Sequence, residues 1–197
     1  LRETQKADLA HIRTVNFKKL ADSLLLDPTT LRHLELIETI NGEKSGSLLR
    51  QVDHTVTAMG GRQLRKWVLR PLLSLERVQD RLDGVEELAF SVTERGKFRE
   101  TLKSVQDIER LVARAALGTA GPRDLSSLGH SLSAIPKIRS ILQNLQAPLI
   151  QSLLSELDDL TDVREKIEAT LTNEPPTLAR EGGFTREGVD AELDELR

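Results

Sequence analysis

Hydrophobic residues recur every three or four positions along most of the chain, which is the spacing of one face of an α-helix. Three long stripes of this kind predict helices: Ser74 is a natural N-cap for the first, and the carboxylate of Asp107 suits the dipole at the start of the second, which Gly118 and Gly121–Pro122 end before the third. Pro136 is expected to kink or break the third helix. The stripes consist of Leu75, Val78, Leu82, Val85 and Leu88; of Ile108, Leu111, Val112, Ala115 and Ala116; and of Leu125, Leu128, Leu132, Ile135, Ile138, Leu142 and Leu145.

Shorter patterns predict further helices on either side of these three. A helix capped by Thr55 or Thr57 precedes Pro71, and residues 27–47 are irregular enough to hold short extended pieces. A loop rich in Pro and Gly over 173–183 separates the helical body from a last helix that continues past Arg197. The apolar residues behind these predictions are Leu9 and Ile12; Leu64, Trp67 and Val68; Leu160, Val163, Ile167 and Leu171; and Val189, Leu193 and Leu196.

Composition agrees with an all-α fold and argues against a dedicated nucleic-acid-binding domain, a thiolate metal site and a membrane span. Aromatic residues are only 3% of the 197 residues, and β-sheets favour them. Lys and Arg number 28 against 31 Asp and Glu, whereas a dedicated nucleic-acid-binding domain usually carries a basic excess. The absence of cysteine excludes disulfides and thiolate metal sites within this chain, and no apolar run is long enough to predict a membrane span.

Residues with catalytic potential do not fall into a recognisable set. The glycine pairs Gly60–Gly61 and Gly182–Gly183 lack the Lys-Ser or Lys-Thr of a phosphate-binding loop, so the first is interpreted as a close helix contact and the second as a turn. The histidines lack metal-ligand spacing. The basic residues near Leu64 are interpreted as a solvated helix face, with contact to a phosphate backbone as the alternative. We therefore predict no catalytic, cofactor-binding or metal-binding residue; the histidines are His11, His33, His54 and His130, and the basic residues are Arg62, Arg65, Lys66 and Arg70.

Trp67 is the only tryptophan, on a helix face shared with Leu64 and Val68. We expect it to be substantially buried against the helix that carries Leu75 and Val78. On that basis its replacement by Ala is expected to cost roughly 3–5 kcal/mol. A surface role in partner binding is the alternative, because exposed tryptophans often mark interfaces.

Several stretches, in order along nearly the whole chain, resemble the MutS family of DNA mismatch repair proteins. Each motif is modest alone, and their order and spacing make the set specific. The matching stretches are Leu26–Leu36, Gly46–Leu49, Val52–Arg62, Leu64-Arg65, Trp67, Pro71-Leu72, Arg81–Glu86, Asp107–Leu111, Ala113-Arg114, Pro122–Leu125, Glu181–Gly183 and Gly188–Arg197.

The resemblance implies a place within a larger protein. Residues 1–22 would be the end of a connector and a lead-in helix, 23–172 a helical core domain, and 173–197 a loop and the start of a lever helix leading to a clamp domain. Both ends of the chain would then be cut from a longer polypeptide. The family's mismatch reader and nucleotide-binding motifs are missing from this sequence, so the chain would contain no cofactor of its own, while the parent protein would bind ATP and Mg²⁺.

The function implied by the resemblance is a structural core and lever segment that links DNA gripping to ATP turnover. The partners implied are mismatched double-stranded DNA through other domains, a second copy in a homodimer, and downstream repair proteins, with a cytoplasmic location and no membrane. Two alternatives follow from the residues alone. One is an independent helical adaptor for partner proteins, and the other is a small helical enzyme, which the lack of a catalytic set disfavours.

Overall fold

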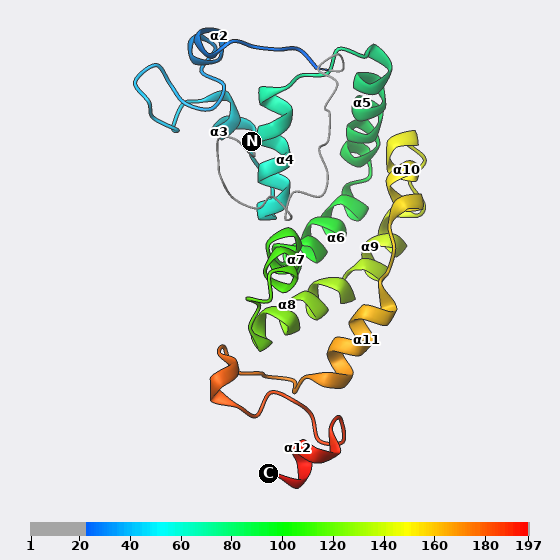
Figure 1. The fold of residues 1–197 in the computed structure, drawn as a ribbon. Helices are drawn as coiled ribbons and strands as arrows, with labels where there is room; N and C mark the ends of the chain where they lie inside the picture. Colours follow the sequence, from blue (N-terminus) through cyan, green and yellow to red (C-terminus); the bar gives the residue numbers. More distant parts are fainter. Residues whose placement is uncertain (1–22, 197) are drawn as a thin grey trace, which may run out of the picture.

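The computed structural model describes residues 23–196, and short α-helices follow one another along this range (Figure 1). Over these residues, β pairing is limited to isolated bridges, so the predicted all-α fold is confirmed. The helices are α2 (Pro28–His33), α3 (Leu48–Val52), α4 (Ala58–Leu69), α5 (Leu75–Phe90), α6 (Val92–Leu102), α7 (Ile108–Ala116), α8 (Pro122–Ser133), α9 (Ile135–Leu142), α10 (Pro148–Glu156), α11 (Thr161–Thr170), the 3₁₀ turn η2 (Ala179–Glu181) and α12 (Ala191–Glu195).

The helix starts follow the capping residues that the sequence predicts. Thr57 caps α4, Ser74 caps α5 and Asp107 caps α7, each accepting a backbone N–H from the first turn. The expected break at Pro136 is present, because α8 ends at Ser133 and α9 begins one residue before the proline.

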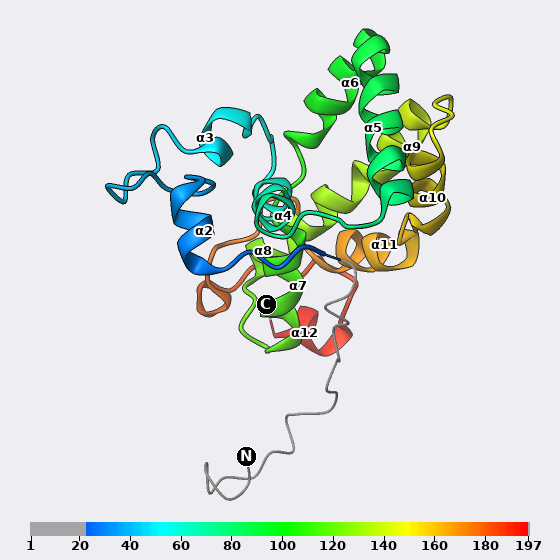
Figure 2. The same cartoon turned by 90° about the horizontal axis from the view of Figure 1, so that it is seen from above.

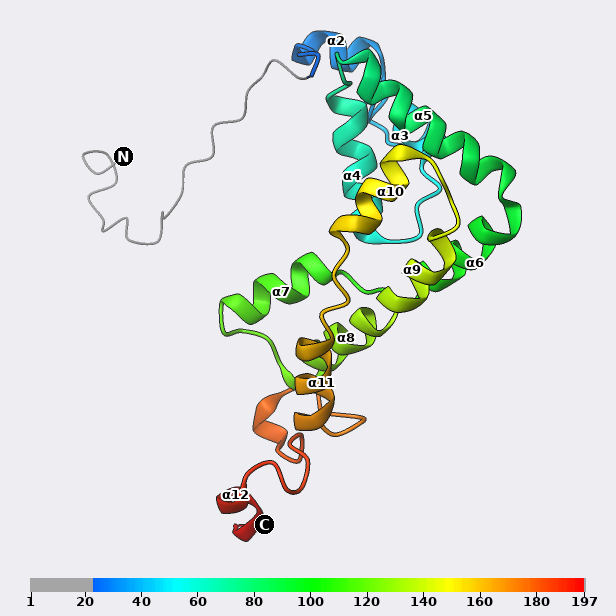
Figure 3. The ribbon, with the colours of Figure 1, turned by 90° about the vertical axis from the view of Figure 1, so that its right-hand side faces the viewer.

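The helices form an elongated body rather than a closed bundle. Figure 1 shows α4 and α5 at one end, α7, α8 and α9 in the middle, and α11 and α12 towards the other end. Helix α10 packs on α5, α9 packs on α6, and α8 lies between α7 and α11. The view from above places α2 and α3 on the opposite side of α4 from α5 and α10 (Figure 2). The side view shows the same elongated course, with α2 at one end and α12 at the other (Figure 3).

Two small apolar clusters hold the middle of the body together. One joins α7, α8 and α9, and the other is built on α10 with Leu88 of α5 against it. Leu157 packs against both clusters, so they are continuous through the segment after α10. The buried members are Leu111, Leu128, Leu132 and Ile135 in the first cluster and Leu145, Ala147, Ile150 and Leu154 in the second.

The predicted stripe on α5 does not form part of this core as a whole. Leu75, Leu82 and Val85 are 79%, 54% and 64% exposed, whereas Leu88 packs against the α10 cluster. Helix α5 meets α10 through the opposite side, where Gly84 is buried and a Cβ on it would lie 3.8 Å from Ile150. The α5 stripe is therefore an unpartnered apolar face over the described residues.

The close helix contact that the sequence assigned to Gly60–Gly61 occurs elsewhere. A Cβ on Gly60 or Gly61 would meet Thr57 or Thr55, which belong to the segment leading into α4, so the interpretation of this pair was wrong. A Cβ on Gly129 of α8 would instead lie 3.1 Å from Ile167 Cγ2 of α11. The missing side chain of Gly129 thus lets α8 and α11 approach each other.

The segments outside the helical body include one predicted turn and one stretch that differs from its prediction. Gly182 and Gly183 have φ of 70° and 67°, which confirms the predicted turn. Residues 27–47 contain α2 and turns instead of extended pieces, because Asp27 caps a short helix. The last predicted helix is present as α12, and the helix predicted around Leu9 and Ile12 lies outside the described residues. Within residues 23–196, no helix combines the length and apolar character that crossing a membrane requires.

Candidate functional site: the polar junction between α4 and α7

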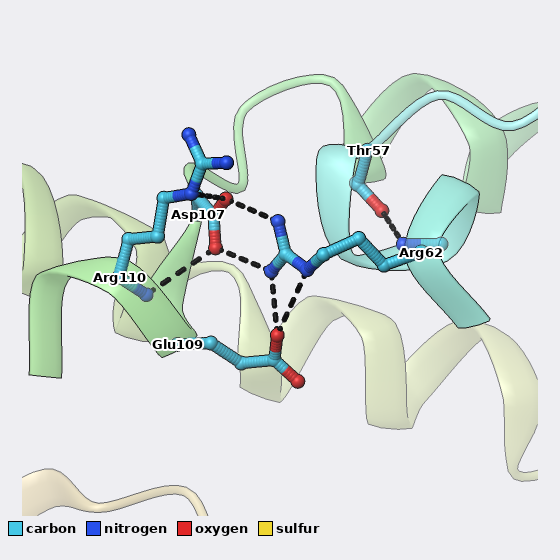
Figure 4. A network of polar contacts seen from close by, with 6 residues as sticks. Thr57, Arg62, Asp107, Glu109 and Arg110 are labelled. Atoms are coloured by element: carbon cyan, nitrogen blue, oxygen red, sulfur yellow. Dashed lines mark hydrogen bonds and ion pairs between the residues drawn. The ribbon is translucent and has the colours of Figure 1, made fainter. Parts of the chain in front are cut away.

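A polar cluster joins two helices that are far apart in the sequence. Arg62 of α4 extends its guanidinium to the carboxylates of Asp107 and Glu109 at the start of α7 (Figure 4). Its Nη1 and Nη2 donate to the two oxygens of Asp107 at 2.7 and 2.8 Å. Its Nη2 and Nε donate to Oε2 of Glu109 at 2.5 and 3.2 Å. The pair with Asp107 is bidentate, the geometry in which Arg binds a carboxylate most strongly.

Local capping fixes the positions of both partners. Thr57 Oγ1 accepts the N–H of Gly60 and starts α4, which places Arg62 on the second turn. Asp107 accepts the N–H of Arg110 at 3.3 Å and starts α7. The same carboxylate therefore caps one helix and binds the side chain of another, and Arg110 Nε adds a second cation at 3.3 Å.

The electrostatics of the junction favour the fully charged state. The hydrogen bond from Arg62 lowers the pKa of Asp107 to about 2, assisted by the backbone N–H of Arg110. The hydrogen bonds to Asp107 and Glu109 raise the pKa of Arg62 further above its ordinary value. Arg62 and Asp107 therefore both stay charged at neutral pH, so the pair is suited to holding α4 and α7 together rather than to acid–base chemistry.

A second contact joins α4 to α5 and corrects the expectation for Trp67. The guanidinium carbon of Arg81 lies 3.9 Å from the centroid of the Trp67 ring, a cation–π geometry. Trp67 faces α5 as expected but remains 38% exposed, so the prediction of substantial burial was wrong. An arginine covers the ring where the sequence suggested Leu75 and Val78, because the α5 stripe points away from the packed side of the helix.

The other sequence candidates do not converge on a site. Arg65, Lys66 and Arg70 are exposed as a solvated face would be, while Arg62 departs from that interpretation because it is bound in the junction. His33, His54 and His130 are exposed and lie on separate elements, and His11 lies outside the described residues. No three His, Asp or Glu side chains among residues 23–196 are grouped closely enough to hold a metal ion.

A small, partly open hollow lies on the described surface. It has a volume of about 130 Å³ and lies between α8, α11 and the following loop. His130 is the only histidine that lines it, beside Gly129 and Ile167. Ser126 also lines it, and no hydrogen bond joins its hydroxyl to His130 in the described part of the chain, so these two side chains do not form the nucleophile–base pair that catalysis needs.

Sequence reasoning missed the pairing of Arg62 with Asp107. The two residues are 45 positions apart, and periodicity and capping signals act within a few positions. Both stand in stretches that carried the resemblance to a known family, and that was the only available signal that they matter.

The comparisons with known proteins agree with that resemblance. The family model described as MutS domain III matches residues 29–196. The chain is 43% identical to the DNA mismatch repair protein MutS of Acetivibrio thermocellus and 41% identical to that of Alkaliphilus oremlandii, in both cases over its whole length. It is 41% identical over 98% of its length to the MutS of Methanosarcina barkeri.

The matches place the chain within a longer kind of protein. It spans 23% of the Acetivibrio protein and 22% of the other two. The matched family model extends over both α4 and α7, and thus over both sides of the polar junction. The chain therefore belongs to the MutS family of DNA mismatch repair proteins and corresponds to its domain III.

Proposed function

We propose that this chain is a core and lever segment of a DNA mismatch repair ATPase, linking a DNA-gripping clamp to the ATPase domain. The observation that carries the proposal is the elongated series of helices joined at defined points by charged contacts, above all Arg62 with Asp107. Helices joined in this way can move together as a rigid body, so a displacement of one end of the segment also displaces the other end. Helices without long-range contacts would move independently of one another. Coupling between two sites further requires an element with two arrangements that both sites bias.

The parent protein would supply the activities that this chain lacks. It would bind mismatched double-stranded DNA through other domains, hold ATP and Mg²⁺ in its ATPase domain, act as a homodimer in the cytoplasm and recruit downstream repair proteins. The chain itself would contribute no catalytic, cofactor-binding or metal-binding residue. Calorimetry tests this part directly, because the chain of residues 1–197 should show no heat of binding on titration with ATP and Mg²⁺. A saturable heat would contradict it.

A substitution at the junction tests the coupling role. In a full-length repair protein that carries this chain, Arg62→Gln should alter the rate at which ATP releases the protein from mismatched DNA and leave ATP hydrolysis without DNA unchanged. Substitutions in coupling networks change the coupling free energy on the order of 0.5–2 kcal/mol. Arg65→Gln is the matched control, since Arg65 is exposed on the same helix. Unchanged ATP-triggered release in a folded Arg62→Gln protein would reject the coupling role.

An independent helical adaptor is the alternative, and the exposed apolar side chains of α5 favour it. An adaptor would bind its partner as the isolated 197-residue chain. A lever segment would act only when joined to the rest of the repair protein. Restoration of ATP-triggered release by adding the separate chain to a repair protein that lacks it would favour the adaptor.

A further inference from the structure

An open groove lies between α4 and the segment 37–53, which includes α3. Its volume is about 500 Å³, within the range of about 300–1,000 Å³ that ligand-binding clefts usually have. Ile37 and Leu49 line one side of the groove, and Gly61 of α4 lines the other. Arg62 also lines it, but its guanidinium is bound in the junction with α7. The groove is therefore next to the junction and large enough to take side chains of a short peptide.

The wall formed by α3 is held in place before any ligand binds. The N–H of Leu49 donates to the carbonyl of Leu36 at 2.9 Å and ties α3 to the turn that follows α2. Ser47 is only 1% exposed, and its hydroxyl donates to the carbonyl of Lys44 at 2.8 Å and accepts the N–H of Arg50 at 3.4 Å. One buried hydroxyl thus fixes the backbone of two cationic residues. A wall that is already ordered lowers the entropy cost of binding.

Three further cations line the groove and have no ion-pair partner within residues 23–196. They are Lys44 and Arg50 on the α3 side and Arg65 on α4, and all three are exposed. Two carboxylates, Glu38 and Asp53, line the groove as well. That of Asp53 already accepts a backbone N–H and a hydroxyl from the segment leading into α4. The groove therefore has an excess of positive charge, although the whole chain has a net charge of −3.

The lining favours a peptide over a nucleic acid as the ligand. No aromatic side chain lines the groove, so bases have nothing to stack on. The carboxylates of Glu38 and Asp53 would repel a phosphate backbone, and the apolar side chains of Ile37 and Leu49 would give it no contact. An acidic peptide uses every part of the lining. Its carboxylates suit the cations, an apolar side chain suits Ile37 and Leu49, and its backbone N–H groups suit Glu38.

We propose that this groove binds an acidic segment of a separate protein, with an apolar side chain on Ile37 and Leu49 and carboxylates on Lys44 and Arg50. The exposed position of the cations favours a separate partner. Charges at the rim of a binding surface mainly speed the diffusional encounter of two molecules, and a segment of the same polypeptide gains little from that. The inference concerns a binding surface and does not depend on the coupling role proposed above.

Selection from a random peptide library displayed on phage tests the proposal on the immobilised 197-residue chain. The enriched peptides should combine Asp or Glu with Leu, Ile or Val. Lys44→Glu with Arg50→Glu should weaken their binding on the order of tenfold or more, because two attractive contacts become repulsive. The same variant should gain affinity for peptides in which Lys replaces the acidic residues. Arg70→Glu with Arg123→Glu is the matched control, since it makes the same charge change at exposed arginines outside the groove.

Several results would overturn the proposal. One is a selection that yields no binder, or binders without carboxylates, and another is equal binding by the two charge-reversal variants when both have the circular dichroism of the unsubstituted chain. Displacement of the peptide by duplex DNA at about 150 mM salt would identify a nucleic-acid surface instead. Self-association of the chain that Lys44→Glu with Arg50→Glu abolishes would identify a second copy as the occupant. Failure of a full-length repair protein to bind a peptide that the chain binds would show that another part of the same polypeptide fills the groove.

Discussion

The carboxylate of Glu87 on α5 accepts the backbone N–H of Ala147, which lies sixty positions later at the start of α10, at 2.7 Å. Its other oxygen accepts the N–H of Gln146 at 2.6 Å. Helix α10 has no capping side chain of its own, so a residue from another helix satisfies the amides at its start. The negative charge also lies near the positive end of the α10 dipole. Glu87 thereby fixes α10 on α5 beside the apolar contact of Leu88.

Replacement of Glu87 by Ala should lower the free energy of unfolding by about 1–2 kcal/mol, the usual cost of losing a capping group. Urea denaturation followed by circular dichroism measures the change. Glu86→Ala is the control, because Glu86 is exposed on the next position of the same helix. Equal free energies for Glu87→Ala and Glu86→Ala would show that the cap contributes nothing.

Glu87 also shows which part of the fold the sequence could not provide. The caps Thr57, Ser74 and Asp107 were predictable because each acts within three residues. The partners of Glu87 and Arg62 lie tens of residues away, where no periodicity reaches. The starts of α4, α5 and α7 were therefore predicted, whereas α6 and α10 had no prediction and the contacts that arrange the helices were missed.

The glycines and the apolar face of α5 show that the sequence also could not predict which residues meet at helix–helix contacts. A Gly-Gly pair is a local signal, but the glycine at a helix–helix contact is the single Gly129, and only its neighbour Ile167 on α11 reveals it. Likewise, periodicity identified the apolar face of α5 and could not tell whether that face meets the core. The side that packs on α10 is the one that carries the buried Gly84 and, beside it, Leu88.

The junction at Asp107 makes stability depend on pH in acid. The pKa of Asp107 is lowered to about 2, against about 3.9 for an unfolded Asp. A group with a depressed native pKa stabilises the fold fully above its unfolded pKa, and the effect disappears as pH falls through the native value. The difference in urea midpoint between the unsubstituted chain and Arg62→Gln should therefore be constant from pH 7 to about 4 and shrink between about 4 and 2.

The control for this pH series is Arg65→Gln, which removes an exposed guanidinium from the same helix. Its midpoint should track that of the unsubstituted chain at every pH. A difference for Arg62→Gln that persists undiminished at pH 2 would mean that the guanidinium stabilises the fold through a partner other than Asp107.

DNA binding by the chain alone should be weak and blind to mismatches. The net charge is −3, and Arg62 is already paired with two carboxylates. Fluorescence anisotropy at about 150 mM salt should give equal, weak binding for a matched and a mismatched duplex. Clear preference for the mismatched duplex would place a mismatch reader in this chain.

The contact between Trp67 and Arg81 predicts the fluorescence of Trp67, the only tryptophan in the sequence. The ring is 38% exposed and has a guanidinium over one face, so its emission should lie between that of a buried and a solvated tryptophan. Trp67→Ala should cost about 2–3 kcal/mol, below the cost of removing a fully buried ring, because part of the area already faces water.

Arg81→Ala should shift the emission to the red and increase quenching by iodide, since it uncovers the ring face. It should lower the free energy of unfolding by about 0.5–1 kcal/mol, the contribution of a cation–π contact at an accessible site. Arg77→Ala removes the same kind of charge one turn earlier on α5 and serves as the control for net charge. If both substitutions shift the emission equally, the change reflects charge rather than contact, and Trp67 is held by its α4 neighbours instead of by Arg81.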